Sequence, residues 1–242
     1  MALIASHRHT RADLEHWRRC EAMDRSYLAL CGPRLDAMTA QAREVIRRFV
    51  ADGPCYLGVS WGKDSVVVAH LAHGIGVPLV WVRVEGVESP DCPAVRDAFL
   101  AGWPADYHEI AATTGAAKGK RTSALGFAEA ARRFGGRHIS GVRGQESTTR
   151  AITVARNSTA SAGSCRPIGR WTGADVFAYL ARHDLPIHPA YACTFGGMLE
   201  RDRVRVGALG GERGTGRGRA EWERRYYHDD YSHAISTLYD KS

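Results

Sequence analysis

Short apolar runs alternate with longer amphipathic segments through the middle of the chain. The runs at residues 55–59 and 79–84 contain few polar positions, which is typical of strands buried on both faces of a parallel sheet. Weaker strands are predicted at 106–110 and 138–142, and helices at 64–73, 92–101 and 123–134. Because alternating strands and helices imply right-handed crossovers, the sequence predicts an α/β protein with a doubly wound, mostly parallel, five-stranded sheet.

The two ends of the chain lack this alternation. Residues 1–50 have apolar positions at helical spacing, and Gly32-Pro33 predicts a break between two helices that pack on the core or cover it. Beyond residue 195, arginines alternate with glycines, a composition typical of a mobile segment without a core of its own. We expect an N-terminal helical extension (1–50), an α/β domain (51–195) and an irregular Arg/Gly-rich C-terminal extension (196–242) whose closing helix spans 221–238.

The charge favours an anionic ligand. Lys and Arg number 33 against 26 Asp and Glu, a net charge of +7, and guanidinium groups grip phosphate or sulfate with a planar fork. Nucleic acid is an alternative partner, and a basic composition bias explains the surface arginines equally well. No apolar run is long enough for a membrane span and the N-terminus lacks the pattern of a signal peptide, so a cytoplasmic protein without a membrane partner is expected.

The six cysteines are scattered, and no two form a C-x-x-C pair. This spacing argues against a zinc ribbon and against an iron–sulfur cluster. Mostly free thiols in a reducing compartment are therefore expected.

A polar turn between the first strand and its helix is the strongest candidate site. It reads Ser60-Trp61-Gly62-Lys63-Asp64-Ser65. Gly62 allows close approach of a ligand to the backbone, and Asp64 and Ser65 are typical first-turn residues of a helix. Backbone N–H groups, two hydroxyls and the Lys63 ammonium at a helix N-terminus predict an anion site, with phosphate as the favoured anion. A turn that only caps the helix is the alternative.

This turn lacks the Gly-x-x-x-x-Gly-Lys-Ser/Thr pattern of a P-loop. It resembles instead the Ser-x-Gly-Lys-Asp-Ser pyrophosphate loop (PP-loop) of the adenine nucleotide alpha-hydrolase-like superfamily, which includes N-type ATP pyrophosphatases, ATP sulfurylase small subunits and phosphoadenosine phosphosulfate (PAPS) reductases. The resemblance implies that superfamily's Rossmann-like fold. It also implies that residues 51–195 bind an adenine nucleotide, ATP or PAPS.

A second motif follows the fourth predicted strand. Residues 141–150 resemble the Gly-x-Arg-x-x-Glu-Ser-x-x-Arg motif of PAPS reductases and their relatives, here with Gly141, Arg143, Glu146 and Arg150. On a helix that starts near Glu146, Glu146 and Arg150 share a face and can pair. The resemblance implies that Arg143 and Arg150 hold the phosphate or sulfate end while Glu146 orients them. An exposed ion pair without function is the alternative. Residues 165–180 resemble the family's Pro-Ile-x-x-Trp-Thr segment, which marks the fold.

The loop after the second strand lies where the family places adenine and ribose. Main-chain groups from Trp81 to Arg83, those of Val82 included, are predicted to read adenine, and Glu85 to bind ribose or a metal, although a solvated loop carboxylate fits equally well. Asp64 is the candidate Mg²⁺ ligand, with a simple helix cap as the alternative.

The chain departs from assimilatory PAPS reductases at its C-terminus. No cysteine follows Cys193, so the nucleophile of their Cys-Gly-x-His tail has no counterpart, and the paired cysteines of a [4Fe–4S] cluster are missing too. Cys165 and Cys193 could replace that nucleophile, but lone cysteines are more often buried apolar residues.

The favoured function is therefore an ATP pyrophosphatase or adenylyltransferase that uses ATP and Mg²⁺ to activate an undefined acceptor. Lys63, Arg143 and Arg150 are its predicted catalytic residues. Two alternatives stay open: a PAPS reductase with an unusual cysteine, and a nucleotide-dependent component of nucleic-acid modification that binds nucleic acid through the Arg/Gly-rich segment. A homodimer is compatible with each function.

Overall fold

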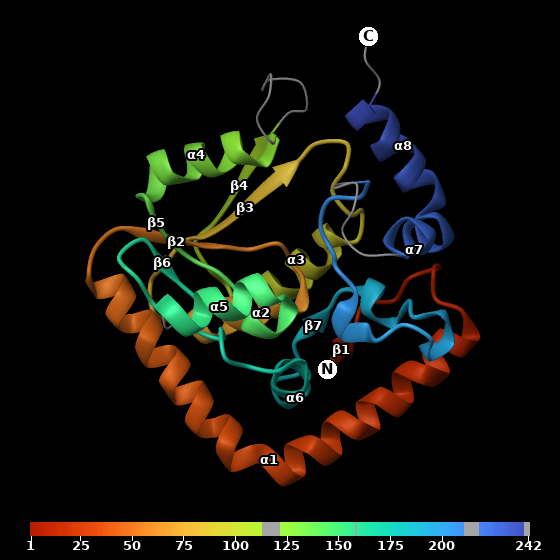
Figure 1. Cartoon of the computed structure of the whole chain (residues 1–242), viewed down its shortest axis with the longest axis horizontal. Helices are drawn as coiled ribbons and strands as arrows, with labels where there is room; N and C mark the ends of the chain where they lie inside the picture. The colour runs from red at the N-terminus through yellow and green to blue at the C-terminus, as the bar shows by residue number, and fades with distance from the viewer. Residues whose placement is uncertain (113–121, 158, 211–217, 240–242) are drawn as a thin grey trace.

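A five-stranded parallel sheet forms the centre of the molecule (Figure 1). The structure is a computed structural model, and it describes residues 1–112, 122–157, 159–210 and 218–239. Its strands, in spatial order, are β4 (Tyr107–Ala112), β3 (Leu79–Val84), β2 (Cys55–Gly58), β5 (Arg137–Ile139) and β6 (Ser164–Cys165). Every pairing is parallel, and Leu57 of the central strand lies opposite Leu79 on one side and Ile139 on the other. The predicted fold class is confirmed.

The helices follow the strands in the order expected for parallel crossovers. They are α1 (Arg11–Ala51), α2 (Lys63–Ala72), α3 (Cys92–Gly102), α4 (Thr122–Phe134), α5 (Thr148–Asn157), α6 (Gly173–Arg182), α7 (Arg219–Tyr226) and α8 (His228–Tyr239). The described ranges also contain four short 3-10 turns: η1 (Gly144–Glu146), η2 (Pro189–Ala192), η3 (Phe195–Gly197) and η4 (Arg201–Arg203). A small parallel pair, β1 (Ala2–Leu3) with β7 (Pro186–Ile187), attaches the N-terminus to the segment after α6.

Helices cover both faces of the sheet, and the apolar core is much larger on one face than on the other. α4 lies on one face of the sheet (Figure 1). Its Ala130 packs there in a small apolar cluster with Tyr56, Val80 and Ile110. Gly126 allows the close approach, because a Cβ there would lie 2.3 Å from Val82 Cγ1. The opposite face carries the main core, in which α2 and α3 pack on the strands and α6 and α1 lie outside them.

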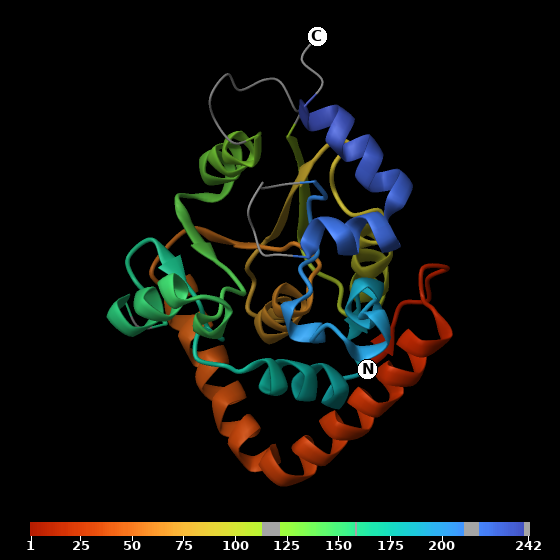
Figure 2. The same cartoon turned by 45° about the vertical axis from the view of Figure 1, so that its right-hand side comes forward.

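α1 is one long helix with a bend, whereas the sequence predicted two helices separated at Gly32-Pro33. Its helical hydrogen bonding continues through Pro33, and Figures 1 and 2 show two straight limbs that meet at an angle near its middle. Pro33 removes one N–H and crowds the preceding turn, which bends a helix without ending it when both limbs are held by packing. Trp17 anchors the limb before Pro33 in the core, and Leu35, Ile46 and Phe49 anchor the limb after it.

Three further boundaries differ from the sequence prediction. The edge strand β6 was not predicted, because two residues carry no periodic pattern. The helix expected to start near Glu146 is the turn η1 followed by α5 from Thr148. The single closing helix predicted over 221–238 is two helices, because Tyr227 leaves the helical region between α7 and α8.

The first part of the Arg/Gly-rich segment packs on the domain. Val204 and Leu209 are buried in the main core, and the Leu209 N–H donates to the Val87 carbonyl at 2.6 Å. The expectation of a mobile segment without a core is therefore wrong for residues 201–210, because apolar side chains anchor this stretch between the arginines. Residues 211–217, which contain the rest of the Arg/Gly pattern, lie outside the described residues. In the part of the chain that is described, no helix is both long and apolar enough to cross a membrane.

A buried carboxylate joins the N-terminal and C-terminal parts of the chain. Asp13, in the first turn of α1, is fully buried and accepts hydrogen bonds from Thr10, from the N–H groups of Thr194 and Gly196, and from the Tyr226 hydroxyl. Burial alone would raise the pKa of Asp13, but these donors outweigh burial and lower it. Asp13 thus stabilises the folded state above its ordinary pKa, and this contribution is lost as the pH falls through the lowered value.

We predict that Asp13→Asn lowers the free energy of unfolding by about 3 kcal/mol at neutral pH, because an amide cannot accept all of these hydrogen bonds. Urea denaturation measures the change. Asp97→Asn, at an exposed position of α3, is the control and should stay within about 0.5 kcal/mol of the wild type. An Asp13 variant as stable as this control would show that the carboxylate does not hold the termini together.

Candidate functional site

A cavity of about 380 Å³ opens at the carboxyl edge of the sheet, within the size range of small-molecule sites. It lies over the ends of β2, β3 and β5 and is lined by Tyr56, Gly58, Val59, Ser60, Trp81, Val82, Glu88, Phe127, His138, Ile139, Ser140, Val142, Arg150 and Arg166. The chain runs from β2 to β3 on one side and returns to β5 on the other, so the cavity sits at the switch point of strand order. Ligands of doubly wound sheets bind at this position.

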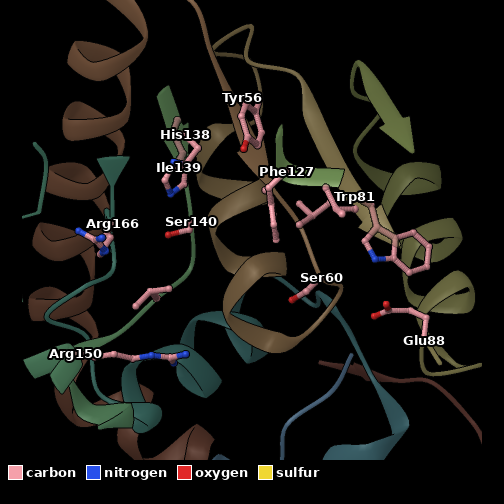
Figure 3. A pocket seen from close by; sticks show the side chains of 14 residues that line it. Tyr56, Ser60, Trp81, Glu88, Phe127, His138, Ile139, Ser140, Arg150 and Arg166 are labelled. Atoms are coloured by element: carbon pink, nitrogen blue, oxygen red, sulfur yellow. The ribbon is translucent and has the colours of Figure 1, made fainter. Parts of the chain in front are cut away.

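The polar side chains around the cavity are divided by charge. Arg150 and Arg166 lie on the side of β5 and β6, whereas Glu88 lies on the side of β3, beneath Trp81 (Figure 3). The hydroxyls of Ser60 and Ser140 lie between them. The arrangement gives the cavity a cationic end and an acidic end.

The loop from Ser60 to Ser65 borders the cavity and carries a strained residue. Trp61 has a φ of 58°, a region that favours glycine, and its buried ring packs against Trp81, Phe99 and Tyr107. Gly62 has no room for a side chain, because a Cβ there would lie 2.7 Å from Val206 Cγ2. Aromatic packing therefore holds the loop in a conformation that costs about 1–3 kcal/mol.

The N-terminus of α2 offers main-chain donors next to this loop. The Lys63 N–H donates to the Tyr191 hydroxyl at 3.1 Å, and the Ser65 hydroxyl bonds the Gly62 carbonyl at 2.9 Å. Within the described residues the N–H groups of Asp64 and Ser65 have no acceptor. Free N–H groups in the first turn of a helix attract anions.

The Lys63 ammonium is not part of the cavity lining and belongs to a buried ion cluster. Its Nζ lies 2.8 Å from Asp64 Oδ2 and 3.3 Å from Asp202 Oδ1. Arg143, which is fully buried, donates from Nε to Asp64 Oδ1 at 2.6 Å and from Nη2 to Asp202 Oδ1 at 2.8 Å. We call these four residues, Lys63, Asp64, Arg143 and Asp202, the charge cluster.

The charge cluster keeps its cations ionised. Burial alone would lower the pKa of Lys63, but the fields of Tyr191, Asp64 and Asp202 outweigh burial and raise it. Asp202 closes the cluster on the solvent side, since its side chain is 33% exposed while Lys63 and Arg143 are almost completely covered. Both oxygens of Asp64 already bind cations. A metal at Asp64 would have to share these oxygens with Lys63 and Arg143, and the metal role of Asp64 stays a prediction.

The other residues that were predicted for the site lie in three different places. Ser60, Val82 and Arg150 line the cavity, and Arg150 forms the predicted ion pair with Glu146. Gly141 packs against the start of α2, where a Cβ would lie 2.8 Å from the Asp64 carbonyl carbon. Arg83 pairs with Glu109 on β4, and neither Arg83 nor Glu85 lines the cavity.

Four side chains of the site were missed as candidates. Arg166 lies in the segment 165–180, which was predicted only to mark the fold. Asp202 lies in a segment that carries no recognisable motif. Glu88 belongs to the loop in which Glu85 was chosen, and sequence gives no means to tell which carboxylate turns inward. Trp81 was considered only for its main-chain groups.

Burial changes the acid–base behaviour of Glu88. It raises the pKa of this carboxyl to about 7, against the smaller opposing effects of the Val84 N–H and of Arg83. The only donor recorded for Glu88 in the described part of the chain is that Val84 N–H, at 3.3 Å. Glu88 is thus a half-buried carboxyl that faces the cavity.

The parallel sheet and the cavity at its switch point define a Rossmann-like α/β protein with a cavity at the carboxyl edge. Residues 127–198 match the family model of the phosphoadenosine phosphosulfate reductase domain. The match confirms the resemblance that the motifs indicate, over less than a third of the chain, and this segment contains Arg143, Arg150 and Arg166. The loop at residues 60–65 lies outside it.

Among solved structures, the chain is similar to phosphoadenylyl-sulfate (PAPS) reductase from Candida auris in a phosphate complex. The two are 14% identical, with a TM-score of 0.45, over 64% of this chain and 87% of that chain. No curated protein matches the sequence significantly.

We predict that Asp202→Ala lowers the free energy of unfolding by about 2 kcal/mol, because the buried cations of Lys63 and Arg143 would then share Asp64 as their one carboxylate in the charge cluster. Sulfate should reverse part of this loss by entering the gap, whereas sodium chloride at equal ionic strength should not. Thermal unfolding at increasing sulfate measures both effects. Asp230→Ala is the matched control, since Asp230 is 35% exposed and pairs with Arg8 at 2.8 Å. An equal response of the two variants to sulfate would contradict an anion site at the charge cluster.

We predict that Glu88→Gln stabilises the protein at about pH 8 and changes it little at about pH 4. Because burial raises the pKa of Glu88 from 4.5 to about 7, its contribution to stability is complete below 4.5 and is lost as the pH rises through 7. The gain at alkaline pH is at most about 3 kcal/mol. Thermal unfolding against pH checks the prediction, with the exposed Glu200→Gln as the control. A gain that does not depend on pH would contradict it.

Proposed function

We propose that this protein is an enzyme that binds ATP in the cavity and transfers its adenylyl group to an acceptor with release of pyrophosphate. The observation that supports this proposal most is the position of the cavity, which joins the switch point of the sheet to the Ser60–Ser65 loop and to Arg150. A base and ribose fit the end near β3, and phosphates fit the end with the arginines and the free N–H groups of α2.

The chemistry follows from charge and position. An acceptor oxygen attacks the α-phosphorus, a new P–O bond forms, and the bond to the β-phosphate breaks so that pyrophosphate leaves with the electron pair. The acceptor proton passes to solvent. Arg150, Arg166 and the loop N–H groups would stabilise the charge on the departing pyrophosphate. Mg²⁺, when bound at Asp64, would neutralise phosphate charge.

The state of the thiols supports adenylyl transfer over reduction. Cys165 is fully buried, and burial raises its pKa to about 12. Burial also raises the pKa of Cys193 and Cys92, both without exposed surface. Cysteines that act as nucleophiles are exposed thiolates, and no cysteine of the described residues lines the cavity.

A PAPS reductase is the second candidate. The family model that matches residues 127–198 is named for this activity, and two arginines in one cavity suit a nucleotide with an additional phosphate. This function would need a thiol from outside the cavity lining.

Phosphorus NMR of the protein with ATP and Mg²⁺, and separately with PAPS and a dithiol, tests the two functions. We expect pyrophosphate from ATP, unaffected by alkylation of the accessible thiols. Arg150→Ala should slow its release about 100-fold, because one charge-assisted contact to the leaving group is lost. Arg47→Ala, an exposed arginine of α1, is the control and should keep the wild-type rate. Formation of adenosine 3′,5′-bisphosphate from PAPS, abolished by alkylation, would establish the reductase instead.

A further inference from the structure

We propose that Glu88 and Trp81 form a side-chain acceptor and donor pair that reads the base of the bound nucleotide and selects a 6-amino purine over a 6-oxo purine. This inference rests on the proposed function, since it assumes that the cavity takes a nucleotide. It assigns the discrimination to two side chains, whereas the motifs point only to main-chain groups.

The indole of Trp81 carries a donor without a partner. Its side chain is 1% exposed, and Nε1 has no hydrogen-bond partner in the described structure. A buried unpaired N–H costs about 1–3 kcal/mol, so such groups call for an explanation. In Figure 3 the indole nitrogen is turned toward the cavity and toward the side on which Glu88 lies.

Glu88 supplies the complementary acceptor. Its Oε2 receives the weak hydrogen bond from Val84, while Oε1 lies 3.5 Å from the place that a Cβ on Gly207 would take. Gly207 is buried and belongs to the C-terminal segment that crosses this loop, so that segment lies against one side of the half-buried carboxylate. A half-buried carboxylate with one weak hydrogen bond gains from a ligand N–H.

The pair distinguishes purines by the group at position 6. Adenine presents an amino donor beside a ring-nitrogen acceptor, which suits Glu88 and Trp81 respectively. Hypoxanthine presents a carbonyl oxygen in place of the amino group, and this oxygen would face the Glu88 carboxylate. The other cavity residues near this end, Val82 and Phe127, are apolar and hold a ring without reading its edge.

Equilibrium binding of ATP and of ITP, its 6-oxo counterpart, at about pH 8 tests the pair. Because a hydrogen bond to a charged group contributes about 1.5–3 kcal/mol, the wild type should prefer ATP by about 10-fold or more. Glu88→Gln should remove most of this preference, since its amide can donate to a 6-oxo group. Trp81→Phe should weaken ATP binding about 5-fold and keep the ring packing. Glu200→Gln should behave as the wild type.

The outcomes separate this inference from the proposed function. A preference for ATP that falls in Glu88→Gln supports the pair. An unchanged ratio in that variant, with ATP still bound, overturns the pair and leaves the proposed function intact. Failure of the wild type to bind either nucleotide overturns both. Glu88→Gln replaces a carboxylate by an amide of the same shape, and the thermal unfolding described above verifies its fold.

Discussion

Two cations and two carboxylates that neutralise one another behind the Ser60–Ser65 loop are the interaction on which the rest of the site depends. Arg143 comes from the loop after β5, Lys63 and Asp64 from the start of α2, and Asp202 from the C-terminal segment. A fully buried guanidinium is tolerated only when its charge is matched and its donors are used. The cluster therefore fixes three separate stretches of chain relative to one another and sets the shape of the cavity beside them.

This arrangement divides the predicted phosphate site into two parts. Arg150 and Arg166 line the cavity, where Arg150 also pairs with Glu146, while Lys63 and Arg143 lie outside the cavity lining and pair with two carboxylates. For Lys63 and Arg143 to bind phosphate, the Asp202 carboxylate would have to move away from them. The same residue types that define the motif can thus serve binding and folding, and only the position of a carboxylate distant in sequence decides which role applies.

The sequence predicted the centre of the fold because its signals are local. The apolar runs of β2 and β3 and the glycines that end helices can be read from neighbouring residues. The bend at Pro33 could not be told from a break, because packing of both limbs of α1 decides the outcome. In the site, the motif identified Ser60 and Arg150, but the inward orientation of Glu88 and the contact of Asp202 with Arg143 depend on tertiary packing between stretches far apart in sequence.

The polarity of the cavity connects these findings. Its cationic end carries Arg150 and Arg166 and its acidic end carries Glu88, so a ligand with an anionic tail and a base that offers an N–H matches both ends. A ligand reversed in the cavity would place phosphate against the Glu88 carboxyl and away from both arginines. An ionised Glu88 repels phosphate, and the two arginines attract it to the other end, so both ends favour the same orientation. One half-buried carboxyl can therefore contribute both to the direction of the nucleotide and to the choice of its base.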